Sequence, residues 1–484
     1  SRIKHTSPQF KSALFRADNV TNTLYYTKYT ICKHLNLTSV KLISRGERAL
    51  TTYLPRLYNL FTMKMLRSKK VVRYDFSKKP WKVRPLLWLA HLIGRLHRAK
   101  RKTKVTYIGE KPSRPRLVLG NHGAFNDFYM LFKAFPSYHI NYIVAIDAFN
   151  DAGDLTLRSL GAIAKRKFIS DLSLMKNMKY CVETLKNTVV MYPEARYSLD
   201  GTTSYLPDSL GKLVKFLKVP VSVLMCCGNY VSDPQWNKYK QDRMPMEATV
   251  KEIVSEEETE TLSVSEINRR IRENFVYDDW KWLRESGNKI TYKNRAFNLN
   301  AILYQCPHCK TEFDMQGEGE YLTCNSCKKS WFMHENGNLE ATTGETEFTY
   351  IPDWFAWQKQ NVHEEVFSGK YSLDADCDVY TLPHAKGFVA QGKGKLHQDS
   401  EKTVLTVNLY GENKVIEYLG TNLESVHVEY RYKDAGDMFD FSIRGDSVWM
   451  HPVSRKDILT KVSLATEEIR DLAKLKLHGG VKLR

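Results

Sequence analysis

Residues 115–130, PRLVLGNHGAFNDFYM, contain the pair of side chains best suited to catalysis in this chain. The first six residues form an apolar run that predicts a buried strand, and the pattern after residue 126 predicts an amphipathic helix. His122 and Asp127 therefore stand where a strand meets a helix, a common place for chemistry on an open α/β sheet. A histidine there can act as a general base near neutral pH, and a carboxylate five residues later can fix its tautomer.

The turn between this strand and helix contains no serine or cysteine that could serve as an enzyme nucleophile. We therefore expect His122 and Asp127 to activate a hydroxyl group of the substrate itself. The alternative is a surface histidine beside an aspartate that caps the helix. This stretch alone does not decide between the two interpretations.

Three more segments of the same region bear on this choice. Residues 188–199, TVVMYPEARYSL, predict a second buried strand that ends at a polar turn. Residues 161–167 read GAIAKRK, and residues 219–221 read VPV. Together with residues 121–127 they resemble, in order and separation, the motifs of the glycerolipid acyltransferase family, whose best-known members acylate lysophosphatidic acid.

The family carries Asn-His-x-x-x-x-Asp, then Gly-x-x-Phe-Ile-x-Arg, then Phe-Pro-Glu-Gly-Thr-Arg-Ser, then a Val-Pro-Val strand. Asn121, His122 and Asp127 match the first motif fully. In the second, Lys167 takes the place of the family arginine. Tyr-Pro-Glu at residues 192–194 matches the start of the third, and residues 219–221 match the fourth.

The resemblance implies the roles of the individual side chains. His122 would take the proton of the attacking hydroxyl while Asp127 orients it. The remaining substrate-binding residues would be Asn121, Glu194 and Arg196, which position the acceptor, and Arg166 or Lys167, which meet its phosphate. Arg196 lies one position earlier than the family arginine, so strand alternation would point it to the other face unless the turn differs.

The reaction implied by the resemblance is O-acyl transfer in phospholipid synthesis. A fatty acyl group would move from acyl-CoA or acyl carrier protein to a hydroxyl of a lysophospholipid. The first candidate acceptor is 1-acyl-glycerol-3-phosphate, which would give phosphatidic acid. The competing interpretation is a nucleic-acid-binding protein without enzymatic activity, because basic tracts and zinc ribbons are common there. It leaves the four ordered motifs unexplained, so nucleic acid is not expected as a partner.

Strand-like and helix-like segments alternate around these motifs. The strand-like runs are 115–120, 141–146, 188–192, 219–226 and 246–254, and helix-like runs follow residues 126, 154, 171 and 208. This alternation predicts an α/β acyltransferase domain over residues 105–300, with a mixed sheet flanked by helices. Ser263 and Glu266 fit a capping box, which predicts a helix that continues to about residue 283.

Residues 301–340 contain the most specific spacing in the chain. Cys306 and Cys309 form one CxxC pair, and Cys324 and Cys327 form a second pair fourteen residues later. Two such pairs predict a zinc ribbon in which four thiolates complete a closed tetrahedron, so the metal would be structural. A redox dithiol would explain one pair but not two.

A strongly basic segment precedes the catalytic motifs. The chain has a formal net charge of +19, and residues 64–104 alone hold fifteen lysines and arginines against one acid. On a helix over residues 81–104, one side collects basic residues: Arg84, His91, Arg95, Arg98 and Lys102. The other side collects apolar residues: Trp88, Leu89, Leu92, Ile93 and Leu96. This pattern is typical of a helix that lies in an anionic membrane surface, although packing within its own domain is an alternative.

The ends of the chain carry no readable motif. Residues 1–63 suggest a basic helical segment of unknown role. Residues 345–484 read as consecutive short strands followed by a helix, which predicts an all-β domain, closed or sandwiched, with a terminal helix. Neither a secretory signal nor a run of the roughly 18–20 apolar residues of a spanning helix is evident. We therefore expect a cytoplasmic protein, associated peripherally with the inner face of the cell membrane.

Overall fold

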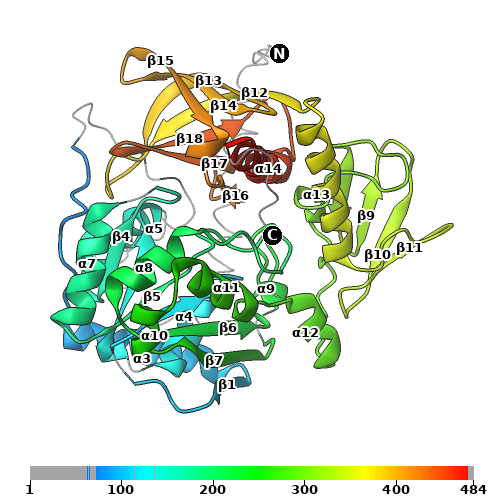
Figure 1. Ribbon diagram of the computed structural model, residues 1–484. Coiled ribbons are helices and arrows are strands. Elements are labelled where there is room, and N and C mark those ends of the chain that lie inside the picture. The colour runs from blue at the N-terminus through cyan, green and yellow to red at the C-terminus, as the bar shows by residue number, and fades with distance from the viewer. Residues whose placement is uncertain are drawn as a thin grey trace, which may run out of the picture. The chain divides into compact units, whose positions relative to one another are not determined.

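The computed structural model describes residues 63, 65, 72–113, 115–135, 137–169, 171–241 and 243–477. The predicted helical segment 1–63 lies outside this range except for its last residue. The described residues form three sheets with their helices (Figure 1).

A seven-stranded sheet carries the catalytic motifs, and its strand order is β1-β7-β6-β2-β5-β3-β4. Neighbouring strands are parallel except β6 and β7, so the predicted mixed sheet is confirmed. The strands are β1 (Thr103–Ile108), β2 (Leu117–Gly120), β3 (Ile140–Ala145), β4 (Ala162–Lys165), β5 (Thr188–Met191), β6 (Val221–Cys227) and β7 (Met246–Val254). The sequence analysis anticipated five of them and missed β1 and β4. The central position of β2 places residue 122 at the middle of one edge of the sheet.

Helices cover both faces of this sheet. One face packs against α7 (Leu172–Glu183), α8 (Ser209–Leu217) and α11 (Val264–Asn274) in a shared hydrophobic core. The other face packs against α4 (Asp127–Ala134) and α5 (Ile146–Ala152). The helices expected after residues 126, 154, 171 and 208 are present, and the one after residue 154 is the short helix α6 (Asp154–Ser159). Two further short helices are α9 (Asn229–Ser232) and α10 (Glu256–Thr261).

The helix predicted to run from residue 263 to about residue 283 is two helices. Ser263 caps the first as expected, because its side chain accepts a hydrogen bond from the Glu266 N–H. That helix ends at residue 274, and α12 (Asp279–Glu285) starts after a cap by Asp278. At the break Phe275 leaves the helical conformation with ψ 63°, and Phe275 and Tyr277 are buried in the core against the sheet.

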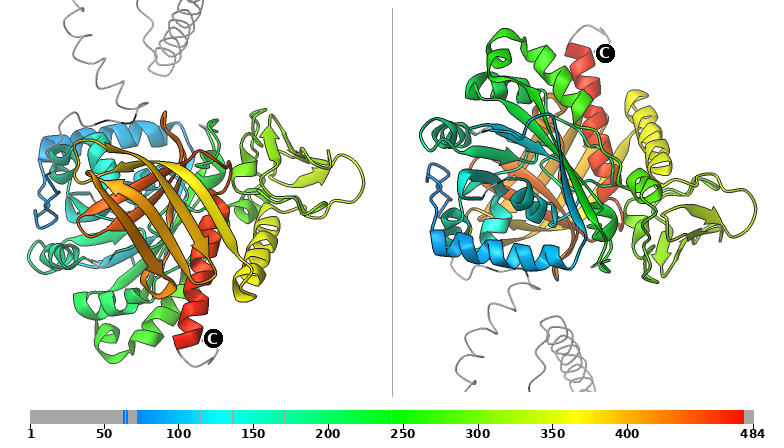
Figure 2. Two further views of the ribbon diagram at one scale, coloured as in Figure 1. Left: turned by 90° about the horizontal axis from the view of Figure 1, so that it is seen from above. Right: turned by 90° about the horizontal axis from the view of Figure 1, so that it is seen from below.

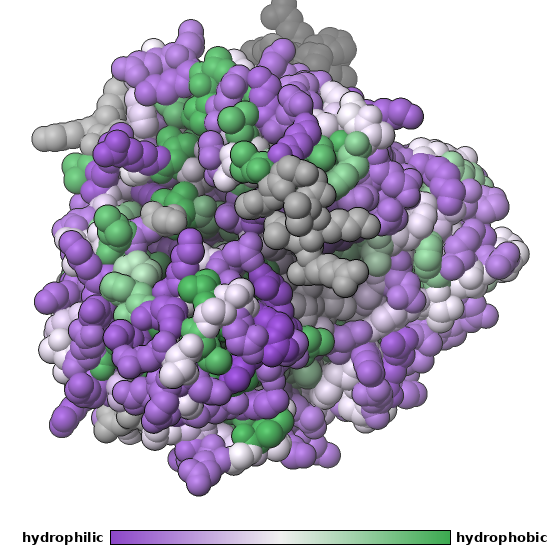
Figure 3. Space-filling view, in the orientation of Figure 1, coloured by the Kyte–Doolittle hydropathy of each residue, from purple (hydrophilic) through white to green (hydrophobic). Residues whose placement is uncertain are grey.

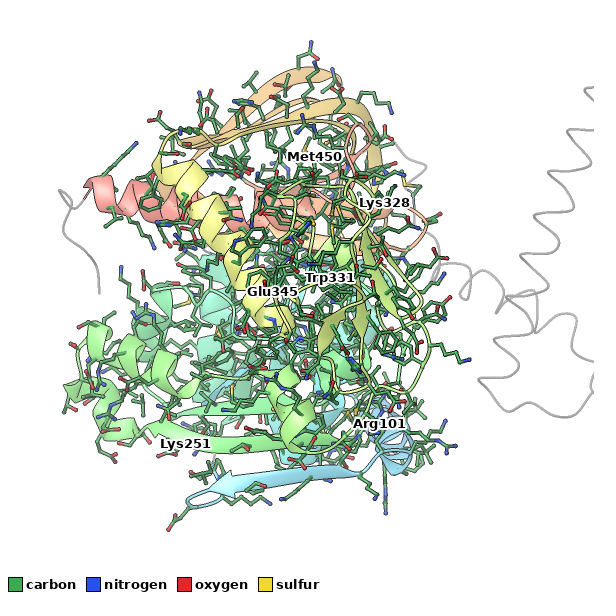
Figure 4. The ribbon with its side chains drawn as sticks, turned by 90° about the vertical axis from the view of Figure 1, so that its right-hand side faces the viewer. Arg101, Lys251, Lys328, Trp331, Glu345 and Met450 are labelled. Carbon is green, nitrogen blue, oxygen red and sulfur yellow. The ribbon has the colours of Figure 1, made fainter. Side chains whose placement is uncertain are left out.

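The second sheet contains the four cysteines. It has the order β11-β10-β9-β8, with β8 (Met315–Glu318), β9 (Tyr321–Cys324), β10 (Ser330–Met333) and β11 (Leu339–Ala341). A helix that the sequence analysis did not anticipate follows, α13 (Ile351–Phe367). Trp331 of β10, labelled in Figure 4, packs against Trp354 of α13 with ring centroids 4.9 Å apart.

The C-terminal sheet has seven antiparallel strands in the order β15-β14-β13-β12-β18-β17-β16. Its strands are β12 (Ser372–Thr381), β13 (Val389–Asp399), β14 (Lys402–Leu409), β15 (Glu412–Leu419), β16 (His427–Tyr432), β17 (Gly436–Ile443) and β18 (Asp446–Pro452). The predicted terminal helix is α14 (Leu459–Leu477). The expected closed or sandwiched arrangement is wrong: the strands form one open sheet, with β15 and β16 at its edges and α14 packed beside β16 and β17 (Figure 2, left).

Packing continues across the predicted boundaries at residues 300 and 345. Trp449 and Phe388 of the C-terminal part share a hydrophobic core with Val118 and Val190 of the α/β sheet. A second core joins the cysteine-containing sheet to α13, α14 and the C-terminal strands. Residues 61–484 accordingly form one compact unit. Within the range that the structure describes, no helix combines the length and apolar character that crossing a bilayer requires.

Candidate functional site

His122 and Asp127 meet at the end of β2, as the spacing predicted. The His122 Nδ1 lies 3.2 Å from the Asp127 Oδ2. The Asp127 side chain is 1 % exposed and that of His122 is 24 % exposed. The same Oδ2 accepts hydrogen bonds from the backbone N–H groups of Gly123 (2.7 Å) and Ala124 (3.0 Å). The carboxylate is therefore held rigidly by the turn, and it fixes the orientation of a histidine that solvent can still reach.

Asn229 completes the support of Asp127, and no sequence motif pointed to it. Its Nδ2 donates a hydrogen bond to the Asp127 Oδ1 from a position 102 residues away. Asn229 is the first residue of α9, and the preceding Gly228 adopts a positive φ of 86°. The buried Asp279 accepts from the N–H groups of Gly228 (3.0 Å) and Val231 (3.2 Å) and so fixes this turn. Burial raises the pKa of Asp279 to about 7.

The second nitrogen of His122 is available for chemistry. The ring stacks on that of Tyr192 and lies tilted against that of Tyr197, with ring centroids 4.2 Å apart in both pairs. Among the described residues, the only hydrogen-bonding partner of the ring is Asp127 at Nδ1, which leaves Nε2 without one. With Nδ1–H directed at the carboxylate, Nε2 carries the lone pair that can accept a proton.

The side chains near this pair do not form an activated nucleophile. Cys226 and Cys227 lie at the end of β6, and burial raises the pKa of both thiols far above the usual range. They therefore stay protonated, and the thiol is a poor nucleophile. The Ser198 hydroxyl donates to the Thr202 carbonyl at 2.7 Å. This arrangement agrees with activation of a substrate hydroxyl.

Glu194 holds the turn beside His122, and its predicted contact with the acceptor stays a prediction. Its carboxylate accepts from the His122 N–H at 3.1 Å, the Ser204 N–H at 2.8 Å and the Tyr277 hydroxyl at 2.7 Å. Ala195 adopts a positive φ of 55°, so the chain turns sharply after Glu194 and simple strand alternation does not apply. Burial raises the pKa of Glu194 to about 7, although the three hydrogen bonds oppose the shift.

This raised pKa gives a testable pH dependence of stability. Between about pH 4.5 and pH 7 the folded state binds the Glu194 proton more tightly than the unfolded state, so the free energy of unfolding should fall as pH rises through this window. In Glu194→Gln that contribution should vanish, which changes the pH dependence by an amount on the order of 2 kcal/mol. Urea unfolding at pH 5.5 and pH 8 measures the difference. The exposed Glu285→Gln is the matched control, and identical pH dependence in the parent and Glu194→Gln would contradict the assignment.

Asn121 hydrogen-bonds to the backbone of the neighbouring strand. It is 2 % exposed. Its Nδ2 donates to the Cys226 carbonyl at 2.8 Å, and its Oδ1 accepts from the Cys226 N–H at 2.7 Å. The side chain therefore fastens the end of β2 to β6, which places His122 correctly. Its predicted contact with substrate stays a prediction.

The three basic residues predicted to contact the acceptor all pack against the C-terminal part. Arg166 donates to the Leu382 carbonyl at 2.9 Å and the Ser447 hydroxyl at 2.8 Å. Arg196 forms a buried ion pair with Glu467 of α14, with N···O 2.7 Å. These bonds occupy groups that the sequence assigned to the acceptor.

Lys167 is surrounded by carboxylates. Its Nζ lies 3.1 Å from Asp147, 3.8 Å from Asp440 and 4.0 Å from Glu429. Burial raises the pKa of Asp440 to about 6, partly offset by Lys167. An acceptor phosphate at Lys167 would have to displace these carboxylates. The roles of Arg166, Lys167 and Arg196 in binding the acceptor stay predictions.

Backbone N–H groups at the start of a helix can stabilise an oxyanion, but those beside His122 already have partners. The backbone N–H groups of Gly123 and Ala124 bind Asp127, and that of His122 binds Glu194.

The four cysteines come together as a group that can hold a metal ion. Their sulfur atoms lie within 4.8 Å of one another. The Cys306 and Cys327 sulfurs are 3.8 Å apart, and those of Cys309 and Cys324 are 3.6 Å apart. A tetrahedral site with Zn–S bonds of about 2.3 Å requires sulfur atoms about 3.8 Å apart. The thiols therefore fit a zinc ion far better than a disulfide.

The two CxxC turns have the same backbone geometry. The Cys306 N–H bonds to the Thr311 carbonyl and the Cys324 N–H to the Lys329 carbonyl, both at 2.9 Å. The residues after each pair, Lys310 and Lys328, both adopt a φ of 65°. This repetition makes each pair a tight turn that directs two sulfur atoms to one point. The predicted four-cysteine cluster is confirmed.

Comparisons with known proteins identify no family. No family model matches the chain, and no curated protein matches its sequence. Among solved structures, the 1-acyl-sn-glycerophosphate (LPA) acyltransferase PlsC from Thermotoga maritima is similar to part of the chain, with 16 % identity and a TM-score of 0.29. The match covers 47 % of this chain and 93 % of that chain. A likeness at this level carries no argument about activity.

Proposed function

We propose that this protein is an O-acyltransferase that moves a fatty acyl group from a thioester to the hydroxyl of a lysophospholipid. The observation that carries the proposal is the oriented histidine at the end of β2, with Nδ1 on the buried Asp127 and Nε2 without a partner among the described residues. The four ordered motifs described above support the choice of reaction.

The reaction follows from this geometry. The His122 Nε2 takes the proton of the acceptor hydroxyl as its oxygen attacks the thioester carbonyl, and Asp127 stabilises the imidazolium that forms. The C–S bond breaks when the tetrahedral intermediate collapses. The imidazolium returns its proton to the departing thiolate, which leaves as a thiol and restores neutral His122. One ester bond forms and one thioester bond breaks.

The substrates follow from the resemblance in the sequence. The proposed donor is acyl-CoA or acyl carrier protein, and the first candidate acceptor is 1-acyl-glycerol-3-phosphate, which would give phosphatidic acid for phospholipid synthesis. The test is incubation of the full chain with lysophosphatidate and other lysolipids, with labelled acyl-CoA and labelled acyl carrier protein as donors. Lipid analysis should show label in the diacyl product. Release of free fatty acid alone, or no transfer with any pair, would contradict the proposal.

The membrane-facing helix is part of this proposal. The helix α3 (Arg84–Ala99) lies against the α/β part (Figure 2, right). Its Leu87 is buried there, and its His91 ring contacts Phe132 and Tyr138. The packed position of His91 corrects its assignment to an exposed basic face. The apolar face of α3 is exposed to solvent, which suits burial in a lipid surface. The exposed apolar residues are Leu86, Trp88, Leu89, Leu92, Ile93 and Leu96.

We infer that α3 docks the enzyme on an anionic bilayer, with the basic segment 64–104 drawn to the lipid head groups. In a cell this would be the inner face of the cell membrane, approached from the cytoplasm. Basic residues near such a surface contribute about 1 kcal/mol each. Burial of the apolar face adds an attraction that salt does not screen.

Vesicle flotation tests this docking. The parent should float with anionic vesicles, less at 1 M salt than at 0.1 M, because the Debye length falls from about 10 Å to about 3 Å. Ile93→Asp should abolish the salt-resistant part, and Arg84→Glu with Arg95→Glu should reduce the salt-sensitive part. Val276→Asp, which changes another exposed apolar residue, is the control. Equal flotation of the parent and Ile93→Asp at high salt would contradict the inference.

We also propose zinc as the metal of the four-cysteine cluster. Cys306, Cys309, Cys324 and Cys327 would supply all four ligands, so the ion has no open position and would serve folding alone. The spare histidines of this region, His308 and His334, lie beside Glu347 and Glu340 and are not needed as ligands.

A further inference from the structure

A cavity of about 730 Å³ lies between the end of β4 and the C-terminal sheet. Its walls are largely apolar: Phe76, Ile169, Ile416, Tyr418 and Ile443. In the space-filling view, hydrophobic surface borders a hollow between the C-terminal sheet and the α/β part (Figure 3). A volume of this size matches the usual range of pockets for lipid-sized ligands.

One end of the cavity carries a buried positive charge, Arg166, which is 2 % exposed. Its terminal nitrogens donate only to neutral groups, at 2.8–3.3 Å: the carbonyls of Leu382, Pro383 and Gly445 and the hydroxyl of Ser447. Its Nε has no hydrogen-bond partner, and over the described part of the chain no carboxylate lies within ion-pair distance of it. The carboxylates of Asp440 and Asp446 attract the guanidinium from beyond ion-pair distance, but burial outweighs this attraction and lowers the pKa of Arg166. A buried charge that is only partly offset is costly, so this arrangement favours an anion.

The other charged side chains at the cavity do not neutralise Arg166. Asp75 accepts from the Ser77 N–H and hydroxyl, and Asp171 accepts from the Ser173 N–H at the start of α7. Both carboxylates are therefore bound to their own turns. The exposed Arg444 lies at the same cavity and adds a second positive charge.

The cavity is separate from the reacting atoms at His122. Arg166 follows β4, and His122 follows β2, with β3 and β5 between these strands. Three strand spacings amount to about 14 Å. His122 does not line the cavity.

We propose that this cavity binds an anionic amphiphile, with its head on Arg166 and Arg444 and its acyl chain along Ile169, Ile416 and Ile443. The site needs no chemistry at His122, so it goes beyond the proposed function. Free fatty acid and a single-chain phospholipid share this chemistry: a compact anion attached to one hydrocarbon chain.

The probe for the test is cis-parinaric acid, a fluorescent fatty acid, added to the full chain carrying His122→Ala so that turnover cannot interfere. We expect one equivalent to bind. Displacement by oleate identifies a carboxylate as a sufficient head, and displacement by 1-oleoyl-lysophosphatidate identifies a phosphate. Either result supports the site.

Variants on neighbouring positions locate the binding. Ile416 and Val415 are adjacent on β15, so their side chains lie on opposite faces of the sheet, and Val415 is 65 % exposed. Ile416→Asp should weaken parinarate binding at least about tenfold because it places a charge on the apolar wall. Val415→Asp should change it less than about twofold.

A charge reversal tests the head-group end. Arg444→Glu lies on the surface, so folding is preserved, and it should weaken binding about fivefold or more. Lys395→Glu, on an exposed part of β13, is its control. Absence of parinarate binding, binding unchanged in both Ile416→Asp and Arg444→Glu, or full displacement by inorganic phosphate alone would overturn the proposal.

Discussion

Replacement of His122 by alanine should lower the rate of ester formation by about a thousandfold. General bases contribute roughly 10²- to 10⁴-fold to catalysis, and the substitution removes the Nε2 that would take the proton. Folding should be unaffected, because the ring is partly exposed and, within the described part of the chain, hydrogen-bonds only to Asp127. Steady-state rates with saturating donor and acceptor measure the effect. The exposed His308→Ala is the matched control.

Substitutions of Asp127 and of Asn229 should lower the rate of ester formation by different amounts in the same assay. Asp127→Asn removes the charge that stabilises the imidazolium, so it should approach the defect of His122→Ala. Asn229→Ala leaves the carboxylate in place but unsupported on one side, and its effect should be smaller. Rates within a few-fold of the parent for both His122→Ala and Asp127→Asn would rule out the assignment.

Loss of the metal should produce the largest effect on stability. The purified chain should contain one zinc ion, and Cys306→Ser together with Cys324→Ser should abolish binding and lower the unfolding temperature by well over 10 °C. Structural zinc sites contribute binding free energy of about 10 kcal/mol or more to small modules. Loss of the metal should also destabilise the C-terminal part, because Cys306, Trp331 and Trp354 belong to a core that extends into α14 and the C-terminal sheet.

Elemental analysis and thermal unfolding measure this prediction. His308→Ala and His334→Ala should keep both the zinc and the unfolding temperature, because neither residue is needed to complete the tetrahedron. A protein never exposed to chelator that contains less than about a tenth of an equivalent of zinc would contradict it. So would a double serine variant as stable as the parent.

Local patterns in the sequence predicted the elements that carry the chemistry. The apolar run before Asn121 and the helix after it are short-range signals, and they placed His122 and Asp127 at the junction of β2 and α4. The CxxC spacing fixed the metal cluster for the same reason, since each turn is local. Edge strands β1 and β4 were missed because they are short or carry polar residues, as in TKVTYI.

Long-range packing could not be predicted from the sequence. The residues predicted to bind the acceptor include Arg166, Lys167 and Arg196, and their partners Ser447, Asp440 and Glu467 lie more than 250 residues further along the chain. The support of Asp127 by Asn229 was invisible for the same reason. The open form of the C-terminal sheet depends on which strands pair, and strand alternation alone does not determine that.

Chemical rescue of His122→Ala tests the central claim most directly. The side chain of His122 reaches solvent, so free imidazole can enter the space that the substitution leaves. We measure transfer of a labelled acyl group from its thioester to lysophosphatidate by the parent, by the variant, and by the variant with added imidazole. The account predicts that imidazole restores the same ester product, in proportion to its neutral fraction as pH rises. An undiminished rate in His122→Ala without imidazole, or no ester from the parent, would contradict it.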